Sequence, residues 1–211
     1  MVEKPAGLLT QPGLGPEQRD SLVLRLQQRW PELRLVHRLD RDTSGLLLLA
    51  RDSDSHRQLS RAFAERQVQK RYLARVLGSP AAASGTIDQP IAKLSHQPPL
   101  YGVVPAGRPS LTHWQVQQPH AHGQTLLLQP ITGRSHQLRV HLQALGHPIL
   151  GDPLYGEPLA ARLCTRLCLH ACGLAFRHPA TGEWLSFASP ARFPPPEACL
   201  PGPSGAEGLV A

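Results

Sequence analysis

The 211-residue sequence has few aromatic residues, few lysines and no long hydrophobic run. Aromatic residues make up only 5% of the chain, so leucine, valine and alanine must supply most of its core. No stretch reaches the ~18 consecutive apolar residues of a membrane span, so we expect no contact with a membrane. The N-terminus also lacks the apolar segment of a secretory signal peptide, which predicts a cytoplasmic protein.

Motifs that bind common cofactors are missing as well. Neither a glycine-rich dinucleotide fingerprint nor a P-loop occurs. Three of the four cysteines recur at every fourth residue, as Cys164, Cys168 and Cys172, and Cys199 stands far downstream. Because the close Cys-x-x-Cys pairs that hold zinc are absent, we interpret all four as reduced structural thiols.

Positive charge is in excess, and arginine carries nearly all of it. The net charge is +7, and of the 22 lysines and arginines only Lys4, Lys70 and Lys93 are lysine. Arginine pairs with phosphate through two hydrogen bonds and stacks on bases, which favours a polyanion such as nucleic acid as partner. A compositional bias that raises arginine, alanine, leucine and proline together explains the same numbers, so the charge alone indicates little.

The hydrophobic pattern predicts short strands, mostly joined by hairpins, with a few helices between them. Helices are expected over residues 17–30, 52–67 and 134–145. Strands are expected over residues 46–49, 70–78, 112–116, 124–131, 167–176 and 184–188. Residues 87–109, rich in proline and glycine, are predicted to be irregular. This order predicts an α+β fold with a mixed, largely antiparallel central sheet and flanking helices.

The most informative stretch is the polar turn from His37 to Gly45, which runs directly into four leucines at 46–49. A short apolar run between turn residues predicts a strand buried on both faces. The turn is therefore attached to the core, where a scaffold can hold a reactive side chain still. Asp40 is the candidate, because neighbouring arginines favour its carboxylate form, which acts as a nucleophile or base. On spacing alone, Asp40 could instead form the turn or cap a helix.

Two further polar sets accompany Asp40. Tyr72 lies on a predicted strand just after a basic pair, and by itself it is more simply read as a core residue. Arg134, His136, Gln137 and Arg139 stand at the start of a predicted helix, where free backbone N–H groups favour a phosphate. Since Arg134 and Arg139 are five residues apart, we do not expect both to grip one group.

Together these motifs resemble those of the RluA-type pseudouridine synthases. The similar segments are residues 37–45, around the family's catalytic aspartate, 70–74, with its base-stacking tyrosine, 130–141, with its active-site arginine, 146–152 and 167–171. These segments follow the family's order, and the resemblance as a whole covers roughly residues 2–192. Within the family, the chain is most similar to the ribosomal large subunit pseudouridine synthase A type, which is short and lacks an S4 RNA-binding domain.

The resemblance implies isomerisation of uridine to pseudouridine in RNA by a monomer, without cofactor or metal. It implies that Asp40 is the nucleophile, Arg139 its ion-pair partner and Tyr72 the residue that stacks on the base. Arg38 would insert where the flipped nucleotide leaves the stack. Further residues expected at the RNA are His37, Thr43, Arg134, His136 and Gln137. The expected partner is structured RNA, either large-subunit ribosomal RNA or the anticodon stem-loop of transfer RNA.

The resemblance also implies one catalytic domain over residues 1–192, with the active cleft across the middle of its sheet. Family members usually have a strand or more before the turn at Lys4, so we expect either a truncated N-terminal edge strand or a misassigned start codon. Residues 193–211, mostly proline, glycine, alanine and serine, are expected to form a disordered tail. The segment 93–107 departs from the family's basic character, and we expect it to influence the choice of RNA.

Two alternatives use the same residues. An RNA-binding or ribosome-assembly protein would keep the fold without needing the chemistry, and an Asp40 variant would then replace the wild-type protein fully in cells. A glycoside- or nucleoside-cleaving hydrolase would need a second carboxylate as acid. Asp42 is close in sequence, but adjacent turn positions rarely converge on one bond. Such a hydrolase would release free uracil, whereas a synthase would not.

Overall fold

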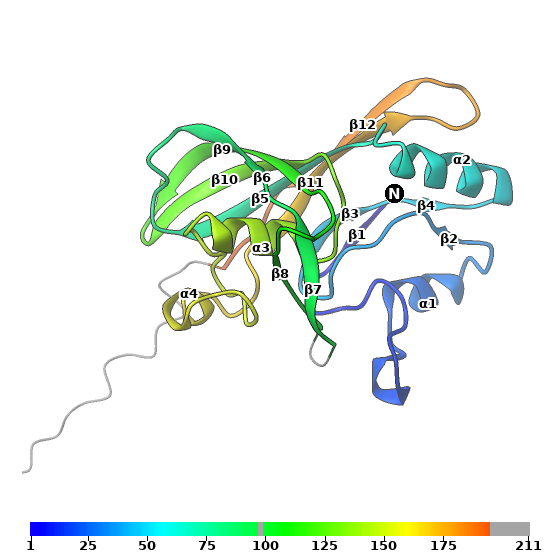
Figure 1. Ribbon diagram of the computed structural model, residues 1–211. Coiled ribbons are helices and arrows are strands. Elements are labelled where there is room, and N and C mark those ends of the chain that lie inside the picture. Colours follow the sequence, from blue (N-terminus) through cyan, green and yellow to red (C-terminus); the bar gives the residue numbers. More distant parts are fainter. Residues whose placement is uncertain (97–98, 195–211) are drawn as a thin grey trace, which may run out of the picture.

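Eight strands form the central sheet of the computed structural model, which describes residues 1–96 and 99–194 (Figure 1). They are β1 (Val2–Lys4), β3 (Ser44–Leu47), β5 (Gln69–Leu77), β6 (Ser84–Asp88), β9 (Leu111–His120), β10 (Gly123–Pro130), β11 (Leu169–Arg177) and β12 (Trp184–Ala188). The order across the sheet is β1-β3-β11-β5-β10-β9-β6, and β12 also pairs with β11. Only β3 and β11 pair in parallel among these described strands, which confirms the predicted mixed, largely antiparallel sheet.

Short elements complete the fold. Two small two-stranded sheets join β2 (Arg34–Leu35) to β4 (Leu49–Ala50), and β7 (Ile91–His96) to β8 (Pro99–Val103). The helices are α1 (Leu22–Gln27), α2 (Ser53–Ala64), α3 (Gln137–Ala144) and α4 (Pro158–Arg162), with a 3-10 turn at Pro16–Gln18. Within the described ranges, no helix has the length and apolar character that crossing a membrane requires.

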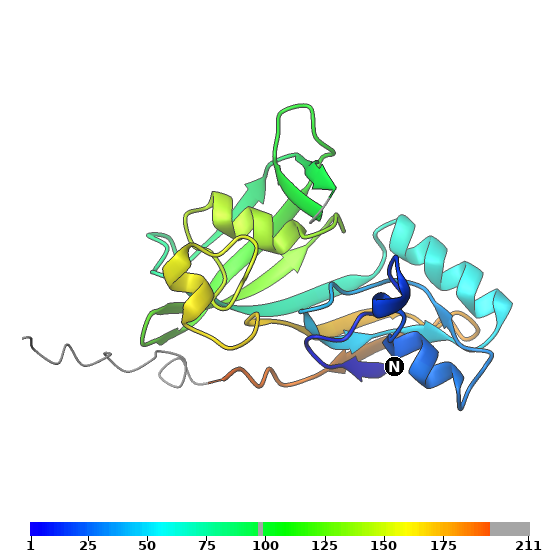
Figure 2. The same cartoon turned by 90° about the horizontal axis from the view of Figure 1, so that it is seen from below.

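The two central strands β5 and β11 join two halves of the molecule. Seen from below, α1 and α2 lie on one half, and α3 and α4 lie on the other (Figure 2). Each half has its own buried apolar cluster, and Tyr72 on β5 packs against clusters on both sides. Its neighbours on the same face, Ala74 and Val76, are fully buried, as the alternation of this strand predicts.

The four-leucine run is buried on both faces, as predicted, but it divides between two sheets. Leu46 and Leu47 belong to β3, and Leu49 belongs to β4. Leu46 and Leu48 enter one apolar cluster, whereas Leu47 and Leu49 enter another. The prediction of a single strand is wrong because the backbone N–H of Leu48 is donated to Nε2 of His37, at 2.9 Å, instead of to a neighbouring strand.

Gly45 lets β3 approach β11 closely. Its φ is +115°, a region that favours glycine, and a Cβ atom there would lie 2.4 Å from the carbonyl oxygen of Ala171. The parallel pairing of Ser44 with His170 and of Gly45 with Ala171 fixes where the preceding turn leaves the sheet. The Asp40 turn is thereby held over the middle of the sheet.

Helix boundaries differ from the prediction where backbone groups find other partners. The helix expected over 17–30 is reduced to α1, because Leu22 and Val23 donate their N–H groups to the carbonyls of Leu9 and Thr10. The next helix, α2, starts where the predicted range 52–67 starts, and the side chain of Asp52 caps it. It ends at residue 64 rather than 67.

The last predicted helix begins late, and one region expected to be irregular is ordered. The helix expected from Arg134 begins at residue 137, because His136 has a left-handed backbone with φ +56°. Residues 87–109 were expected to be irregular, but they contain the end of β6 and the β7–β8 hairpin. Proline and glycine there occupy turns as well as strand ends. The expected tail lies outside the described residues from position 195 on, as does Cys199.

Candidate active site

A cavity of about 550 Å³ opens between the two halves, across the middle of the sheet. One wall is the turn before β3 with the end of α2, and the other wall is the connection between β10 and α3. Tyr72 on β5 and Leu169 on β11 line it between these walls. The cleft therefore lies where the resemblance implied it.

All of the residues expected at the site line this one cavity: His37, Arg38, Asp40, Thr43, Tyr72, Arg134, His136, Gln137 and Arg139. Arg134 and Arg139 both line it, and whether they grip one group together, which their spacing argued against, stays a prediction. Arg134 precedes the helix, and the left-handed backbone at His136 turns the chain between the two arginines. Helical spacing therefore does not apply to this pair.

Arg139 on α3 faces two carboxylates. Its Nε and Nη2 donate hydrogen bonds of 2.8 and 2.6 Å to the carboxylate of Asp152. Its Nη1 lies 4.0 Å from Oδ2 of Asp40, an ion-pair contact that is too long for a hydrogen bond. The Arg139 side chain is 2% exposed and that of Asp40 is 24% exposed. The Asp40 carboxylate thus lies close to the positive charge of Arg139 while it remains partly exposed in the cavity.

Asp152 is the main functional residue that sequence reasoning missed. It is fully buried, and its Oδ1 also accepts the backbone N–H groups of Leu154 and Tyr155. Although burial opposes it, the hydrogen bond and charge of Asp152 raise the pKa of Arg139. The signal in the sequence was Asp152 itself, the acidic residue at the end of the 146–152 segment that resembles the family.

Lys4 was missed in the same way. It is fully buried, and its Nζ donates hydrogen bonds to the carbonyls of Pro5, Leu8 and Arg41, at 2.7, 2.7 and 2.8 Å. Burial lowers the pKa of Lys4 to about 8, against the opposing charges of Asp42 and Asp40. One side chain therefore ties the N-terminal segment to the residue that follows Asp40.

The residue before Asp40 is tied down as well. The hydroxyl of Thr10 donates to the carbonyl of Leu39 at 2.7 Å and accepts the Leu39 N–H at 3.2 Å. The N–H of Thr43 closes the turn on the carbonyl of Asp40. Both chain neighbours of Asp40 are thus anchored, so its backbone is held in place before any substrate binds.

Tyr72 presents an aromatic ring to the cavity beside Asp40. Burial, together with the negative charge of Asp40, raises the pKa of Tyr72. The phenol is therefore neutral at physiological pH. A neutral ring fixed between two apolar clusters is suited to stacking against a base.

Two cavity residues, His37 and Gln137, direct their polar atoms into the protein. His37 stacks on Phe63 with ring centroids 4.4 Å apart, and burial, with the charge of Lys70, lowers the pKa of His37 to about 3. Its Nε2 is occupied by the Leu48 N–H. Gln137 accepts from the N–H of Arg134 and donates to the carbonyl of Leu111. These two side chains hold the walls in shape, and Thr43, which also lines the cavity, is 2% exposed.

His136 lies between the cavity and Tyr155. Its Nδ1 is 2.7 Å from the Tyr155 hydroxyl, which also accepts the N–H of Tyr101. The Arg139 guanidinium lies over the Tyr155 ring at 5.0 Å. Burial lowers the pKa of His136, although the charge of Asp40 opposes this. His136 is therefore a neutral imidazole with one nitrogen engaged by the protein.

The cavity holds one carboxylate among the described residues, that of Asp40. Asp42 forms an ion pair with Arg41 at 3.1 Å and does not line the cavity. A hydrolase that needs a second carboxylate as acid is therefore not supported. The described part of the chain also has no group of three or more histidine, cysteine, aspartate or glutamate residues placed to bind a metal.

Comparison with known proteins identifies the family. Residues 1–144 match the model of the RNA pseudouridylate synthase family. The dual-specificity RNA pseudouridine synthase RluA of Escherichia coli K12 is 44% identical over 92% of this chain and 89% of its own length. Its namesake from Pasteurella multocida is 45% identical over the same shares.

Solved structures give the same result. Human RNA pseudouridylate synthase domain containing 1 has a TM-score of 0.72 and 35% identity, over 81% of this chain and 74% of its own. Human RNA pseudouridylate synthase domain containing 4 has a TM-score of 0.69 and 28% identity, over 92% and 84%. The chain therefore belongs to the RNA pseudouridylate synthase family, and it is an isomerase that converts uridine to pseudouridine in RNA.

Proposed function

We propose that Asp40 is the nucleophile of this reaction, with Arg139 as its counter-charge and Tyr72 as the stacking surface for the target base. The observation that carries the proposal is the 4.0 Å contact between Asp40 and Arg139 in a cavity that also presents Tyr72. Residues 1–192 form the proposed catalytic domain, and the proposed site residues all come from one chain, which supports a monomer. The proposed location is the cytoplasm.

The reaction rearranges one nucleoside without adding or removing atoms. The bond from C1′ to N1 breaks, the base turns, and a bond forms from C1′ to C5. The proton of C5 is lost, and N1 gains one. Asp40 can begin this by attacking the sugar, by attacking the base or by removing a sugar proton. Each route needs an ionised carboxylate beside the sugar and a closed pocket that keeps the freed uracil in place.

The target base must leave its helix before it can reach Asp40. Extruding a nucleotide costs a few kcal/mol, and stacking on Tyr72 returns about 1–3 kcal/mol of it. Arg38 lies exposed at the edge of the cavity, where its side chain can take the place of the flipped base. Thr43, His37 and Gln137 position the walls of the pocket, and Arg134 and His136 face the RNA.

Large-subunit ribosomal RNA and the anticodon stem-loop of transfer RNA are the proposed substrates. The names of the bacterial relatives, which describe them as dual-specificity enzymes, support more than one RNA. We assign the choice between RNAs in part to the segment 93–107, most of which lies in or beside the β7–β8 hairpin.

Mapping pseudouridines tests both the activity and the substrates. Pseudouridine should disappear from specific positions of ribosomal and transfer RNA in cells that lack this gene, and wild-type protein should restore them. The purified enzyme should modify both RNAs in vitro and release no free uracil. Unchanged pseudouridine maps in the deletion strain would contradict the proposal.

A further inference from the structure

We propose that Arg66, Lys70, Arg108 and Arg134 form a clamp for the phosphodiester groups on either side of the target uridine. This proposal rests on the proposed function, because it assumes that an RNA strand enters the cavity. It adds a binding site for the RNA backbone to the site for the base. The four residues are called the phosphate clamp below.

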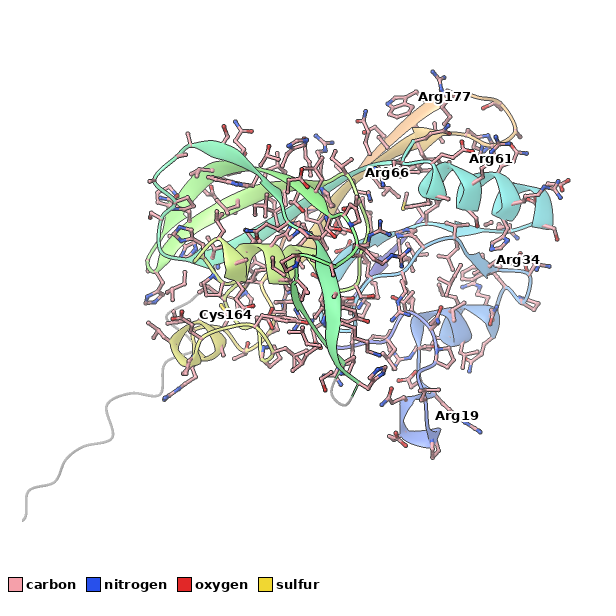
Figure 3. All side chains as sticks on the ribbon, viewed as in Figure 1. Arg19, Arg34, Arg61, Arg66, Cys164 and Arg177 are labelled. Carbon is pink, nitrogen blue, oxygen red and sulfur yellow. The ribbon has the colours of Figure 1, made fainter. Side chains whose placement is uncertain are left out.

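The clamp has members on both walls of the cavity mouth. Arg66 follows α2, and Lys70 lies at the start of β5, on the wall that also carries Phe63. Arg134 lies on the opposite wall, between β10 and α3. Figure 3 labels Arg66 between the end of α2 and the central sheet. A strand that delivers its base into the cavity must pass between these two walls.

Hydrogen bonds to carbonyl groups hold two of the cations in place. Lys70 donates from Nζ to the carbonyl of Thr132 at 3.3 Å, which connects β5 to the opposite wall. Arg134 donates from Nε to the carbonyl of Pro109 at 3.3 Å. Arg108, which precedes Pro109 in the chain, is exposed beside this wall and does not itself line the cavity. These contacts fix the positions of the positive charges without neutralising them.

The positive charges of the clamp repel one another, as the pKa values of Arg134 and Lys70 indicate. Burial lowers the pKa of Arg134, and the charges of Arg108 and Arg66 lower it further. Burial likewise lowers the pKa of Lys70 to about 8, with a contribution from Arg66. Such mutual repulsion is unfavourable in the free protein and is relieved when a phosphate binds between the cations.

No member of the clamp forms an ion pair with a carboxylate within the described ranges. The outward-facing arginines of α2 behave differently. Arg57 pairs with Asp54 and Arg61 pairs with Glu65, each at 2.7 Å. The clamp thus presents cations without carboxylate partners beside the cavity, where a polyanion can supply the missing charge.

The backbone of Arg66 supports a role for its side chain. Its φ is +61°, and it follows the end of α2, at a position that glycine or asparagine occupies most easily. An arginine there strains the backbone, so the residue costs stability in the free protein. A gain in binding explains why this side chain stands at the mouth of the cavity.

The salt dependence of RNA binding tests the clamp. The probe is a fluorescein-labelled anticodon stem-loop RNA, titrated with the full-length protein between about 50 and 200 mM salt. Arg66→Ala and Arg134→Ala should each raise Kd about tenfold at the lower salt concentration. Each should also reduce the slope of log Kd against log salt by about 0.7–0.9, and the double variant should reduce it by about twice that amount.

Two further variants separate binding from folding. Arg61→Ala removes the same charge from α2 but away from the cavity, and should leave Kd and the slope unchanged; Figure 3 labels both Arg61 and Arg66. Arg66→Gly should weaken RNA binding as much as Arg66→Ala, yet raise Tm by about 2–4 °C. Slopes of the Arg66 and Arg134 variants equal to the wild-type slope would overturn the clamp.

The same RNA with cytidine in place of the target uridine separates the clamp from the proposed function. Its phosphates are unchanged, so the slope differences between variants should persist. If the Arg66 and Arg134 variants have lower slopes but the wild-type enzyme forms no pseudouridine on the uridine RNA, the clamp is kept and the proposed function is rejected. If the variants have the wild-type slope and the wild-type enzyme forms pseudouridine normally, the clamp is rejected and the proposed function is kept.

Discussion

The turn that carries Asp152 and the turn that carries Asp40 both present a carboxylate to Arg139, but they hold it differently. Asp152 is fully buried and accepts two hydrogen bonds from Arg139 and two from backbone N–H groups. Asp40 is partly exposed and lies 4.0 Å from the same guanidinium. Among the described residues, no hydrogen bond is donated to its side chain.

The difference assigns separate tasks to two identical side chains. A carboxylate that is surrounded by donors is stabilised and unreactive, so Asp152 fixes the orientation of Arg139. A carboxylate near a charge but without donors keeps its lone pairs available, so Asp40 can react. The rigidity that Asp40 needs comes from its backbone, through Lys4 and Thr10.

Removing the charge of the reactive carboxylate gives the largest expected effect. Asp40→Asn should reduce pseudouridine formation by about 10⁴-fold or more, because an amide cannot act as nucleophile or base. The side chain makes no hydrogen bond that the fold requires, so Tm should stay within about 1 °C of wild type. The two measurements are a pseudouridine assay on RNA and thermal unfolding. Isomerisation at a normal rate would remove Asp40 from the mechanism.

Asp152 should show the opposite pattern, with stability most affected. Asp152→Ala leaves the buried Arg139 cation without its main partner, and the free energy of unfolding should fall by about 3–5 kcal/mol. Asp152→Asn keeps an oxygen for the backbone donors and should cost less. Urea denaturation measures both variants. A loss below about 1 kcal/mol for the alanine variant would mean that Arg139 is stabilised in another way.

Substitutions of Tyr72 test the proposed stacking surface for the target base. Tyr72→Ala should lower kcat/KM by about 5- to 150-fold, which corresponds to about 1–3 kcal/mol of base stacking. Tyr72→Phe keeps the ring, so most of this activity should remain. Steady-state kinetics on a short RNA, below the Tm of each variant, compare the two. Equal losses would assign the role to the hydroxyl group instead of the ring.

A smaller effect concerns the support of the Asp40 turn by His37. In the folded protein the pKa of His37 is lowered to about 3, whereas in the unfolded chain it is near 6.5. The unfolded chain therefore takes up the proton first, and stability is lost as the pH falls from about 6.5 toward 3. We expect a loss of about 1 kcal/mol between pH 6.5 and 5.5 from this residue.

The His37→Gln variant isolates that contribution. Glutamine does not titrate, and its amide oxygen can accept the Leu48 N–H in place of Nε2. The other buried histidines are unchanged, so any difference in the pH slope of unfolding belongs to His37. Parallel stability curves for the two proteins between pH 7 and 5 would show that His37 titrates normally.

Local patterns predicted most of the fold. Alternation placed Ala74 and Val76 on a buried face, and Asp52 marked the start of α2, because these features depend on neighbours in the chain. The β7–β8 hairpin was missed, since its prolines and glycines are typical of loops. The division of the leucine run was missed because His37, eleven residues away from Leu48, takes its N–H group.

The sequence by itself determined the family, most strands of the central sheet and nine of the residues that line the cavity, since the motifs are short and their residue types are specific. Tertiary structure alone decided how those residues divide the work. Asp152 takes the hydrogen bonds of Arg139, Lys4 donates to the carbonyl of Arg41, and Arg66 and Arg134 line opposite walls of one cavity. Each of these arrangements joins residues far enough apart in sequence that only the packing of the core brings them together.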